Sequence, residues 1–295
     1  MSREVLVVTH PRRSVVREVA QRVLDQFVAA GVAPRVLRDE ADLLDLRCDN
    51  VVPPDEAAAL GVELVFVLGG DGSLLRGAEL ARNADAPLLG VNLGHVGFLA
   101  EAEPDALEST IDHVIRKDYQ VEERMTVDVT VRHRGELTYR GWALNEVSLE
   151  KVDRSRMLEC VVEVDNRPLS RWGCDGMICS TPTGSTAYAF SVGGPVMWPG
   201  VEALLVAPIS AHALFARPLV LAPTSSVAIE VLPSTPAVLS CDGRRSVEVA
   251  EHSLVEVTRG RRPVRLAVVH PRPFTDRLVA KFDLPVTGWR GRTGR

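Results

Sequence analysis

The sequence predicts two kinds of domain in one chain: an N-terminal α/β part with a parallel sheet, and a C-terminal part built from antiparallel strands. Short apolar runs alternate with helical patterns as far as Asp118, and closely spaced short strands with turn signals follow. The 295 residues suffice for about two domains. We expect the boundary near residues 119–123 and a cleft between the two parts, since ligand sites favour such interfaces.

The α/β part begins with Val5–Val8, an apolar run typical of a buried parallel strand. Residues 14–30 follow with one apolar face at helical spacing, which Gly31 ends. The alternation continues with strands near 35–37, 64–68 and 88–91, and with helices over 73–83 and 104–116. Residues 39–60 are acidic and contain two adjacent prolines, so we expect a partly irregular connection there. It is either a solvated surface loop or a mobile cover over a site.

The second part consists of short strands that predict an antiparallel sandwich or barrel. They are expected at 127–131, 161–164, 227–231, 238–241, 246–249, 254–257 and 264–268. A short helix near 275–281 closes the pattern. The predicted divisions are therefore residues 1–120, 121–270 and a C-terminal segment 271–295.

Charge is distributed unevenly along the chain. Residues 259–295 hold ten Lys+Arg against two Asp+Glu, a net charge of +8, while residues 1–258 hold 24 against 37, a net charge of −13. A nucleic-acid binder carries its basic excess over a whole domain face, so we expect no nucleic-acid partner. The chain has only three lysines, and none follows a glycine-rich loop, which excludes a Walker-type phosphate site.

Two further observations bear on the compartment. No run of about eighteen uncharged apolar residues occurs, and no basic leader precedes the first strand, so we expect no membrane partner. The five cysteines are odd in number and form no CxxC pair, which favours free thiols. We expect a soluble cytoplasmic protein.

The strongest local motif is Gly69-Gly70-Asp71-Gly72, between an apolar strand and a helix. Successive glycines let the backbone approach a phosphate, and the helix N-terminus offers free N–H groups. A carboxylate is unexpected at the mouth of an anion site, because it repels the ligand. Asp71 there therefore suggests a residue that transfers a proton or binds a metal ion. The alternative is a type I′ hairpin turn, which the helical pattern after it disfavours. A Rossmann dinucleotide fingerprint is poorly supported, because Leu75 occupies the place of its third glycine.

A second motif, residues 175–188, joins a short apolar segment to a hydroxyl-rich loop and a helix expected to start at Ser185 or Thr186. Five Ser and Thr hydroxyls lie in this loop and can donate to ribose, phosphate or carboxamide groups. Helix capping accounts for one or two of them, so we favour ligand binding. A third feature, Asn145-Glu146, follows an apolar run, and taken alone it fits an exposed strand end.

These features, in this order, resemble the NAD kinase family. The matching stretches are GGDGSLLR (69–76), GVNLGHVGFLAE (90–101), NEVSLEK (145–151), DGMICSTPTGSTAYAFSVGGPV (175–196) and ARPLVL (216–221). The GGDG string alone also occurs in 6-phosphofructokinases and diacylglycerol-type lipid kinases, and the combination is what is specific. The resemblance implies a Rossmann-like N-terminal domain and an all-β C-terminal domain, with the C-terminal segment returning to the first. It also implies phosphorylation of the adenosine 2′-hydroxyl of NAD to NADP with a divalent cation such as Mg²⁺, by a homodimer or homotetramer.

The resemblance implies roles for individual residues. Asp71 would accept the proton of the attacking hydroxyl, with Gly72 beside it, and Arg76 would suit a phosphate. Asn145 and Glu146 would bind the NAD that is phosphorylated, with Glu146 accepting two ribose hydroxyls. The remaining expected ligand contacts are Asp175 at the nicotinamide end, then Thr186, Ala187, Tyr188, Ala189, Phe190 and Ser191, and finally Arg156 and Arg244.

Two departures from the family pattern and three alternatives stay open at this point. Ser73 stands where Thr is commonest, and Gly173 stands where several members have a basic residue, which removes one expected phosphate contact. The phosphoryl donor is either ATP or polyphosphate. The rival functions are a lipid or sugar kinase that shares GGDG, and a pyridine-nucleotide sensor without catalysis. For the basic tail, the family layout predicts an intramolecular clasp on the acidic N-terminal domain.

Overall fold

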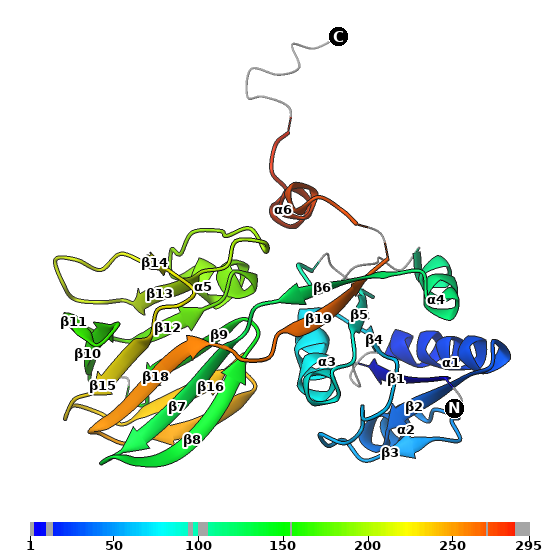
Figure 1. Cartoon of the computed structure of the whole chain (residues 1–295), viewed down its shortest axis with the longest axis horizontal. Helices are drawn as coiled ribbons and strands as arrows, with labels where there is room; N and C mark the ends of the chain where they lie inside the picture. Colours follow the sequence, from blue (N-terminus) through cyan, green and yellow to red (C-terminus); the bar gives the residue numbers. More distant parts are fainter. Residues whose placement is uncertain are drawn as a thin grey trace, which may run out of the picture. The chain divides into compact units, whose positions relative to one another are not determined.

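The structure is a computed structural model that describes residues 3–9, 14–93, 97–99, 106–153, 155–269 and 271–286. It divides into two compact units, each with its own core (Figure 1). Unit 1 contains Met1–Glu123 and Val264–Arg295, and unit 2 contains Arg124–Pro263. Among the described residues, no helix is long and apolar enough to cross a membrane.

Unit 1 is built on a seven-stranded sheet with the order β3-β2-β1-β4-β5-β19-β6. The strands are β1 (Arg3–Thr9), β2 (Val32–Leu37), β3 (Val51–Val52), β4 (Leu64–Leu68), β5 (Leu88–Val91), β6 (Gln120–Arg124) and β19 (Val264–Val268). The pairings from β3 across to β19 are all parallel, as the alternating pattern predicts. The prediction that β19 belongs to the antiparallel part is wrong. This strand is largely buried, as a parallel strand covered on both faces requires, and it pairs with β5.

Helices cover both faces of this sheet. They are α1 (Ser14–Ala29), α2 (Arg38–Leu44), α3 (Asp71–Ala84) and α4 (Leu107–Arg116). A further helix, α6 (Phe274–Phe282), follows β19 in the chain and has no buried residue. Residues of α1, α2 and α4 share one core with alternate residues of β1 and β4. α3 packs on the other face, where a Cβ on its Gly77 would lie 2.6 Å from Val67 Cγ2. Residues 39–60 are irregular only in part, since they contain most of α2 and all of β3. The prediction of a solvated surface loop is wrong for the part that forms α2, because Glu40, Ala41 and Leu44 of this helix are buried.

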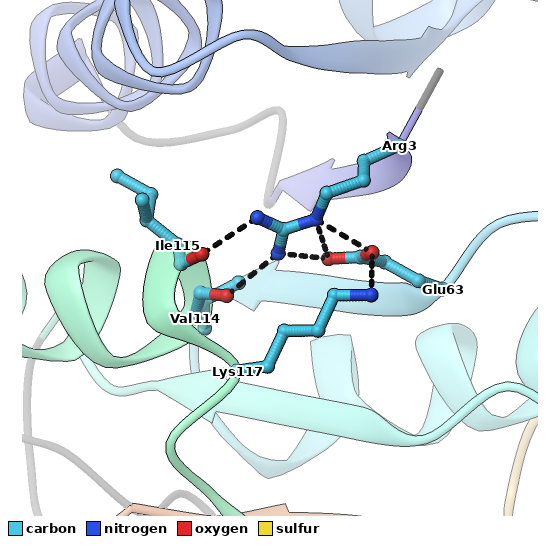
Figure 2. Close-up of polar contacts among 5 residues, drawn as sticks. All are labelled: Arg3, Glu63, Val114, Ile115 and Lys117. Atoms are coloured by element: carbon cyan, nitrogen blue, oxygen red, sulfur yellow. Dashed lines mark hydrogen bonds and ion pairs between the residues drawn. The ribbon is translucent and has the colours of Figure 1, made fainter. Parts of the chain in front are cut away.

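A polar cluster ties β1 to the end of α4 (Figure 2). Arg3 donates to Glu63 at 2.9 Å and to the carbonyl oxygens of Val114 and Ile115 at 3.0 and 2.6 Å. Lys117 Nζ lies 3.2 Å from the same Glu63 carboxylate. Burial disfavours ionisation of Glu63, but the hydrogen bonds from Arg3 and Lys117 outweigh it and lower its pKa. The cluster therefore satisfies two carbonyls in the last turn of α4 and ties that turn to the amino-terminal end of β1.

Unit 2 is a sandwich of two six-stranded antiparallel sheets, as predicted. One has the order β11-β10-β15-β18-β7-β8, and the other β14-β13-β12-β9-β16-β17. The first sheet contains β7 (Val127–His133), β8 (Glu136–Ala143), β10 (Leu158–Val164), β11 (Arg167–Cys174), β15 (Val227–Val231) and β18 (Ser253–Arg259). The second contains β9 (Glu146–Lys151), β12 (Gly176–Ser180), β13 (Leu204–Ile209), β14 (Leu219–Leu221), β16 (Ala237–Cys241) and β17 (Arg245–Val249). Both sheets contribute to a single core that contains the fully buried Trp172.

The outer face of the second sheet is partly covered by a short connection. A 3₁₀-helix, η2 (Thr183–Thr186), leads into α5 (Tyr188–Ser191), so the expected helix is present but short. Ala189 of α5 packs with Ile178, Leu205 and Ala207 on this face. Because side chains alternate along a strand, Glu146, Ser148 and Glu150 of β9 lie on the same outer face. This face is therefore apolar beneath α5 and polar along β9.

Candidate active site

The GGDG motif lies where the strand order of unit 1 reverses. The chain passes from β1 outward to β2 and β3, then returns to β4 on the other side of β1. In open α/β sheets, ligands bind beyond the carboxyl ends of the strands at such a reversal. Only Gly69 and Gly70 separate the end of β4 from Asp71, which begins α3, and Thr9 ends the neighbouring β1. The motif thus occupies the position in unit 1 that the topology favours for a ligand.

The glycines of the motif leave open space around the backbone. α3 begins at Asp71, which rules out the hairpin alternative. Among the described residues, a Cβ built on Gly70 or Gly72 would meet no atom within 4 Å, and neither residue has a positive φ. Neither packing nor conformation within unit 1 therefore demands glycine at these two positions. A close approach by a ligand to the backbone explains them.

The carboxylate of Asp71 is held by the backbone of residues 97–99. The N–H groups of Phe98 and Leu99 donate to its two oxygens at 3.3 and 3.2 Å. Gly97 approaches so closely that a Cβ there would lie 2.4 Å from Asp71 Oδ1. A carboxylate has about four acceptor positions, so two remain for a ligand hydroxyl.

Arg76, one turn further along α3, is engaged by two carboxylates. Its guanidinium lies 2.6 Å from Asp39 Oδ2 and 3.2 Å from Glu40 Oε1. Glu40 is fully buried and accepts the N–H and hydroxyl of Thr9 through its other oxygen. Burial is the main reason that its pKa rises to about 7. The expected role of Arg76 at a phosphate stays a prediction, and a phosphate there would have to share this arginine with Asp39 and Glu40.

In unit 2, the Asn145-Glu146 pair sits in a loop that Asp242 holds from one side. The carboxylate of Asp242 accepts the N–H groups of Leu144, Asn145 and Glu146 at 3.0, 2.7 and 3.3 Å. Arg245 donates to it at 2.9 Å and lies 4.5 Å over the ring of Trp142. Asp242 thus fixes the backbone of three successive residues, and the position of Asn145-Glu146 follows from it.

The hydroxyl-rich loop holds the same pair from the other side. Ser180 Oγ donates to the carbonyl of Asn145 at 3.0 Å, and Thr181 Oγ1 donates to that of Leu144 at 2.6 Å. Ser185 is buried, and its hydroxyl donates to the carbonyl of Pro182 at 2.7 Å and accepts the N–H of Met197 at 2.9 Å. A Cβ on Gly184 would lie 2.1 Å from the carbonyl oxygen of Asn145, so only glycine fits there. The prediction that most of these hydroxyls serve a ligand is therefore wrong for these three, which hold the loop in place.

Asn145 and Glu146 are buried, and each has a side-chain oxygen that no described residue hydrogen-bonds. Their side chains are 8% and 7% exposed, so the exposed strand end is wrong. Asn145 Oδ1 and Glu146 Oε2 have no hydrogen-bond partner within the described part of the chain. Burial, and next the charge of Asp242, raise the pKa of Glu146 to about 8, although the backbone N–H of Tyr188 opposes the shift. Buried oxygens without partners are costly, and a ligand with hydroxyl or amide donors would satisfy both.

The far end of β9 carries a second group of polar residues. Lys151 Nζ lies 2.6 Å from Asp175 Oδ1, and this ion pair lowers the pKa of Asp175, whose side chain is 44% exposed. Tyr188 reaches along the strand, since its hydroxyl donates to Glu150 at 3.1 Å. On the outer face of β9, Glu146 and Glu150 are four positions apart, roughly 13 Å along a strand. This polar face is thus long enough for an extended ligand.

Comparison with known proteins decides the family. The ATP-NAD kinase N-terminal domain matches residues 5–119, and the ATP-NAD kinase C-terminal domain matches residues 144–269. The chain belongs to the ATP-NAD kinase family. It is 57% identical to the NAD kinase of Thermobifida fusca (strain YX), over 99% of this chain and 92% of that protein. It is 56% identical to NAD kinase 2 of Streptomyces avermitilis, over 98% and 97%. Family membership makes the chain an enzyme that phosphorylates NAD to NADP.

Two solved structures share the fold. Yeast NADH kinase complexed with NADH has a TM-score of 0.86 at 22% identity, and it aligns over 100% of this chain and 90% of its own. An NAD kinase from Archaeoglobus fulgidus in complex with ATP has a TM-score of 0.72 at 23% identity, over 95% and 98%. The arrangement predicted from the sequence, α/β followed by a β-sandwich, is therefore confirmed.

The remaining expected ligand contacts of this ATP-NAD kinase differ in exposure. Thr186, Ala187 and Tyr188 are half-buried, and Phe190 and Ser191 are exposed. Ala189 is fully buried in the core beneath α5, so its side chain serves packing. Arg244 is exposed in the turn that contains Asp242, which puts it at the Asn145 end of β9. Arg156 lies beyond the Lys151 end, 70% exposed, and donates to the carbonyl of Ser234 at 3.3 Å.

Two residues that build the site were missed by the sequence analysis. Asp242 and Glu40 each stand in an ordinary local context, a Cys-Asp-Gly turn and an acidic segment. Both act over long sequence distances, Asp242 on residues 144–146 and Glu40 on Thr9 and Arg76. The one local feature that could have indicated Asp242 was the Asp-Gly turn after a buried strand, since Asp side chains in turns often accept backbone N–H groups.

Proposed function

We propose that this kinase transfers the γ-phosphoryl group of ATP to the adenosine 2′-hydroxyl of NAD, with the chemistry at the GGDG loop and NAD held at Asn145-Glu146. The 2′-oxygen forms a bond to the γ-phosphorus while the bond from that phosphorus to the β,γ-bridging oxygen breaks. The proton of the hydroxyl passes to Asp71 and then to solvent. The products are NADP, ADP and a proton.

The observation that carries this proposal is a pair of buried oxygens, Asn145 Oδ1 and Glu146 Oε2, that have no hydrogen-bond partner in the part of the chain that the structure describes. Ribose hydroxyls are donors of the size and kind that such oxygens need. With a pKa of about 8, Glu146 holds its proton at neutral pH when no ligand is bound. We therefore expect ribose binding to favour its ionised form, which can accept two hydroxyls.

Asp71 is the proposed proton acceptor. A carboxylate is a weak base for a ribose hydroxyl, but in phosphoryl transfer positioning and charge stabilisation do most of the work. Two backbone N–H groups fix the Asp71 carboxylate and leave acceptor positions open. We therefore expect Asp71 to orient the hydroxyl as much as to deprotonate it.

We also propose that a divalent cation, Mg²⁺, takes part. The described residues contain no group of three His, Cys, Asp or Glu side chains placed to hold a metal ion. Mg²⁺ bound with nucleotides needs only one or two carboxylates, because phosphates and water supply its other ligands. Asp71 fits that requirement and would hold the cation. Bound there, the cation would neutralise charge on the transferred phosphoryl group.

The test is to incubate the protein with NAD, ATP and MgCl₂ and to detect NADP with an NADP-specific dehydrogenase. We expect NADP to accumulate, and EDTA to stop it. No NADP from folded protein would contradict the proposal. Phosphorylation of diacylglycerol or a hexose phosphate would then indicate the lipid or sugar kinase, and NAD binding without turnover would indicate the sensor. A parallel reaction with polyphosphate in place of ATP decides the donor, and NADH in place of NAD tests the acceptor.

We further propose that the kinase works in the cytoplasm as a homodimer or homotetramer. The support is the family resemblance, together with the five cysteines, which are all free thiols as predicted. Size-exclusion chromatography with light scattering measures the oligomer directly. A monomer at micromolar concentration would contradict this part of the proposal.

A further inference from the structure

The C-terminal helix α6 contacts the segment that holds Asp71. Arg277 Nη1 donates to the carbonyl oxygen of Phe98 at 2.9 Å. The ring of Phe98 also packs against Phe274 and Phe282, with centroids 6.1 and 5.6 Å apart. α6 belongs to unit 1, so all these contacts lie within one compact unit.

Arg277 and Asp71 bind opposite ends of one peptide group. The carbonyl of Phe98 and the N–H of Leu99 belong to the same peptide bond. Arg277 donates to that carbonyl, and the N–H donates to Asp71 Oδ1 at 3.2 Å. A positive donor on the carbonyl polarises the peptide and strengthens the hydrogen bond on its other side. The arginine on α6 is therefore linked to the Asp71 carboxylate through a single rigid plane.

We propose that Arg277 is a positioning residue for phosphoryl transfer, which it serves by fixing the 98–99 peptide and through it the plane of the Asp71 carboxylate. This inference rests on the proposed role of Asp71. Gly97 makes the positioning sensitive, because the backbone beside the carboxylate is already at the closest approach that glycine allows. A small shift of a catalytic group lowers turnover much more than it lowers substrate affinity.

The chain offers a control on β19, the strand that precedes α6. Arg265 Nη1 also donates to a backbone carbonyl at 2.9 Å, that of Asp85. Asp85 is the residue after the last turn of α3, at the opposite end of that helix from Asp71. Replacing Arg265 removes the same charge and the same kind of hydrogen bond, together with a 3.4 Å contact to the Asp85 carboxylate, without touching the 98–99 peptide. α6 has no buried residue, so we expect Arg277→Gln to fold.

The experiment compares wild-type enzyme, Arg277→Gln, Arg277→Lys and Arg265→Gln. It measures kcat for NADP formation, the Kd for NAD by calorimetry, and the Tm. For Arg277→Gln we expect kcat to fall between about 10-fold and 100-fold, with the Kd for NAD within about 3-fold of wild type. Arg277→Lys keeps a cationic donor and should recover most of the loss. Arg265→Gln should keep kcat within about 2-fold.

Two outcomes would overturn the inference. One is a kcat for Arg277→Gln that matches the kcat of Arg265→Gln. The other is a parallel loss of kcat and NAD affinity with a Tm well below that of Arg265→Gln, since that pattern describes a structural role. Absence of NADP from the wild-type enzyme would instead contradict the proposed function, so the two failures are distinguishable.

Discussion

Asp71 and Glu146 are both carboxylates at the start of an element, yet their surroundings differ. Asp71 begins a helix in the parallel unit, is half-buried, and accepts one backbone N–H on each oxygen. Glu146 begins a strand in the sandwich and is almost fully buried, with one oxygen that has no partner among the described residues. Its pKa rises to about 8. The comparison suggests separate tasks: the open, oriented carboxylate suits chemistry, and the buried one suits binding.

The two loops also achieve their rigidity in different ways. The GGDG loop has two glycines, Gly70 and Gly72, around which no described atom would meet an added Cβ, and its carboxylate is held by the main-chain N–H groups of Phe98 and Leu99. The Asn145-Glu146 loop is held between the Asp242 carboxylate and the hydroxyls of Ser180 and Thr181. A phosphate can approach the first loop through its backbone, and the second presents side-chain oxygens.

Asp71→Asn should produce the largest effect. It keeps the shape of the side chain but removes the proton acceptor, so we expect turnover to fall at least ~100-fold. Steady-state kinetics of NADP formation measure this. Unchanged turnover would exclude Asp71 from the mechanism. It would also contradict the assignment of chemistry to Asp71 and of binding to Glu146.

The pH dependence of stability should reveal the buried character of Glu146. Its pKa is about 8 in the folded protein, against an ordinary value of 4.5. Between these pH values the folded state binds more protons than the unfolded state, so the free energy of unfolding falls as pH rises. Relative to Glu146→Gln, the wild type should lose up to about 1.4 kcal/mol per pH unit in this window, a few kcal/mol in total. Urea unfolding at pH 5, 6.5 and 8 measures the difference, and a difference that does not change with pH would contradict the buried, neutral carboxyl.

Gly184→Ala tests how tightly the second loop is fixed. The new Cβ would lie 2.1 Å from a backbone oxygen, that of Asn145, which cannot rotate away. We expect a loss of about 1–3 kcal/mol in stability together with weaker NAD binding. Gly72→Ala is the control for the GGDG loop, because its Cβ would meet no atom of the described residues within 4 Å and should leave the Tm unchanged. Equal stability losses in the two variants would contradict the claim that the Asn145-Glu146 loop is packed more tightly than the GGDG loop.

Arg156→Ala should have the smallest effect on the kinetics, and it tests whether the NAD-binding surface of unit 2 extends to this loop. The side chain is 70% exposed, and its ion pair with Asp153 spans 3.9 Å. Exposed pairs of this kind contribute little, so we expect the KM for NAD to rise by no more than about 3-fold. A much larger rise in KM would extend the binding surface to this loop and strengthen the role that the family resemblance gives Arg156.

Much of the fold could be predicted because its signals are local. The apolar run of β4 and the helical pattern of α3 place Asp71 at a strand-to-helix turn without any tertiary information. β19 could not be assigned to its sheet, because a short apolar strand looks alike in a parallel sheet and in a sandwich. Its partner β5 lies far back in the sequence, and nothing near residue 264 indicates it.

The site was predicted less completely, because the burial of a side chain and its hydrogen-bond partners depend on residues that are distant in the sequence. Asn145-Glu146 resembles an exposed strand end until Asp242 and Gly184 are seen to enclose it. Ser180 and Thr181 have the composition of ligand donors, yet their hydroxyls are used by the carbonyls of residues 144 and 145. The ion pair of Arg76 with Glu40 could not be predicted either, because Glu40 lies on a different helix, α2.

The most direct test of the division of tasks is to measure the Kd for NAD and the kcat for NADP formation in Asp71→Asn and Glu146→Gln, prepared side by side. We expect Asp71→Asn to bind NAD within about 3-fold of wild type while its turnover falls at least ~100-fold. Glu146→Gln should show the opposite pattern, with affinity reduced about 10-fold or more and the smaller loss in turnover at saturating NAD. The same loss of affinity and turnover in both variants would contradict the account.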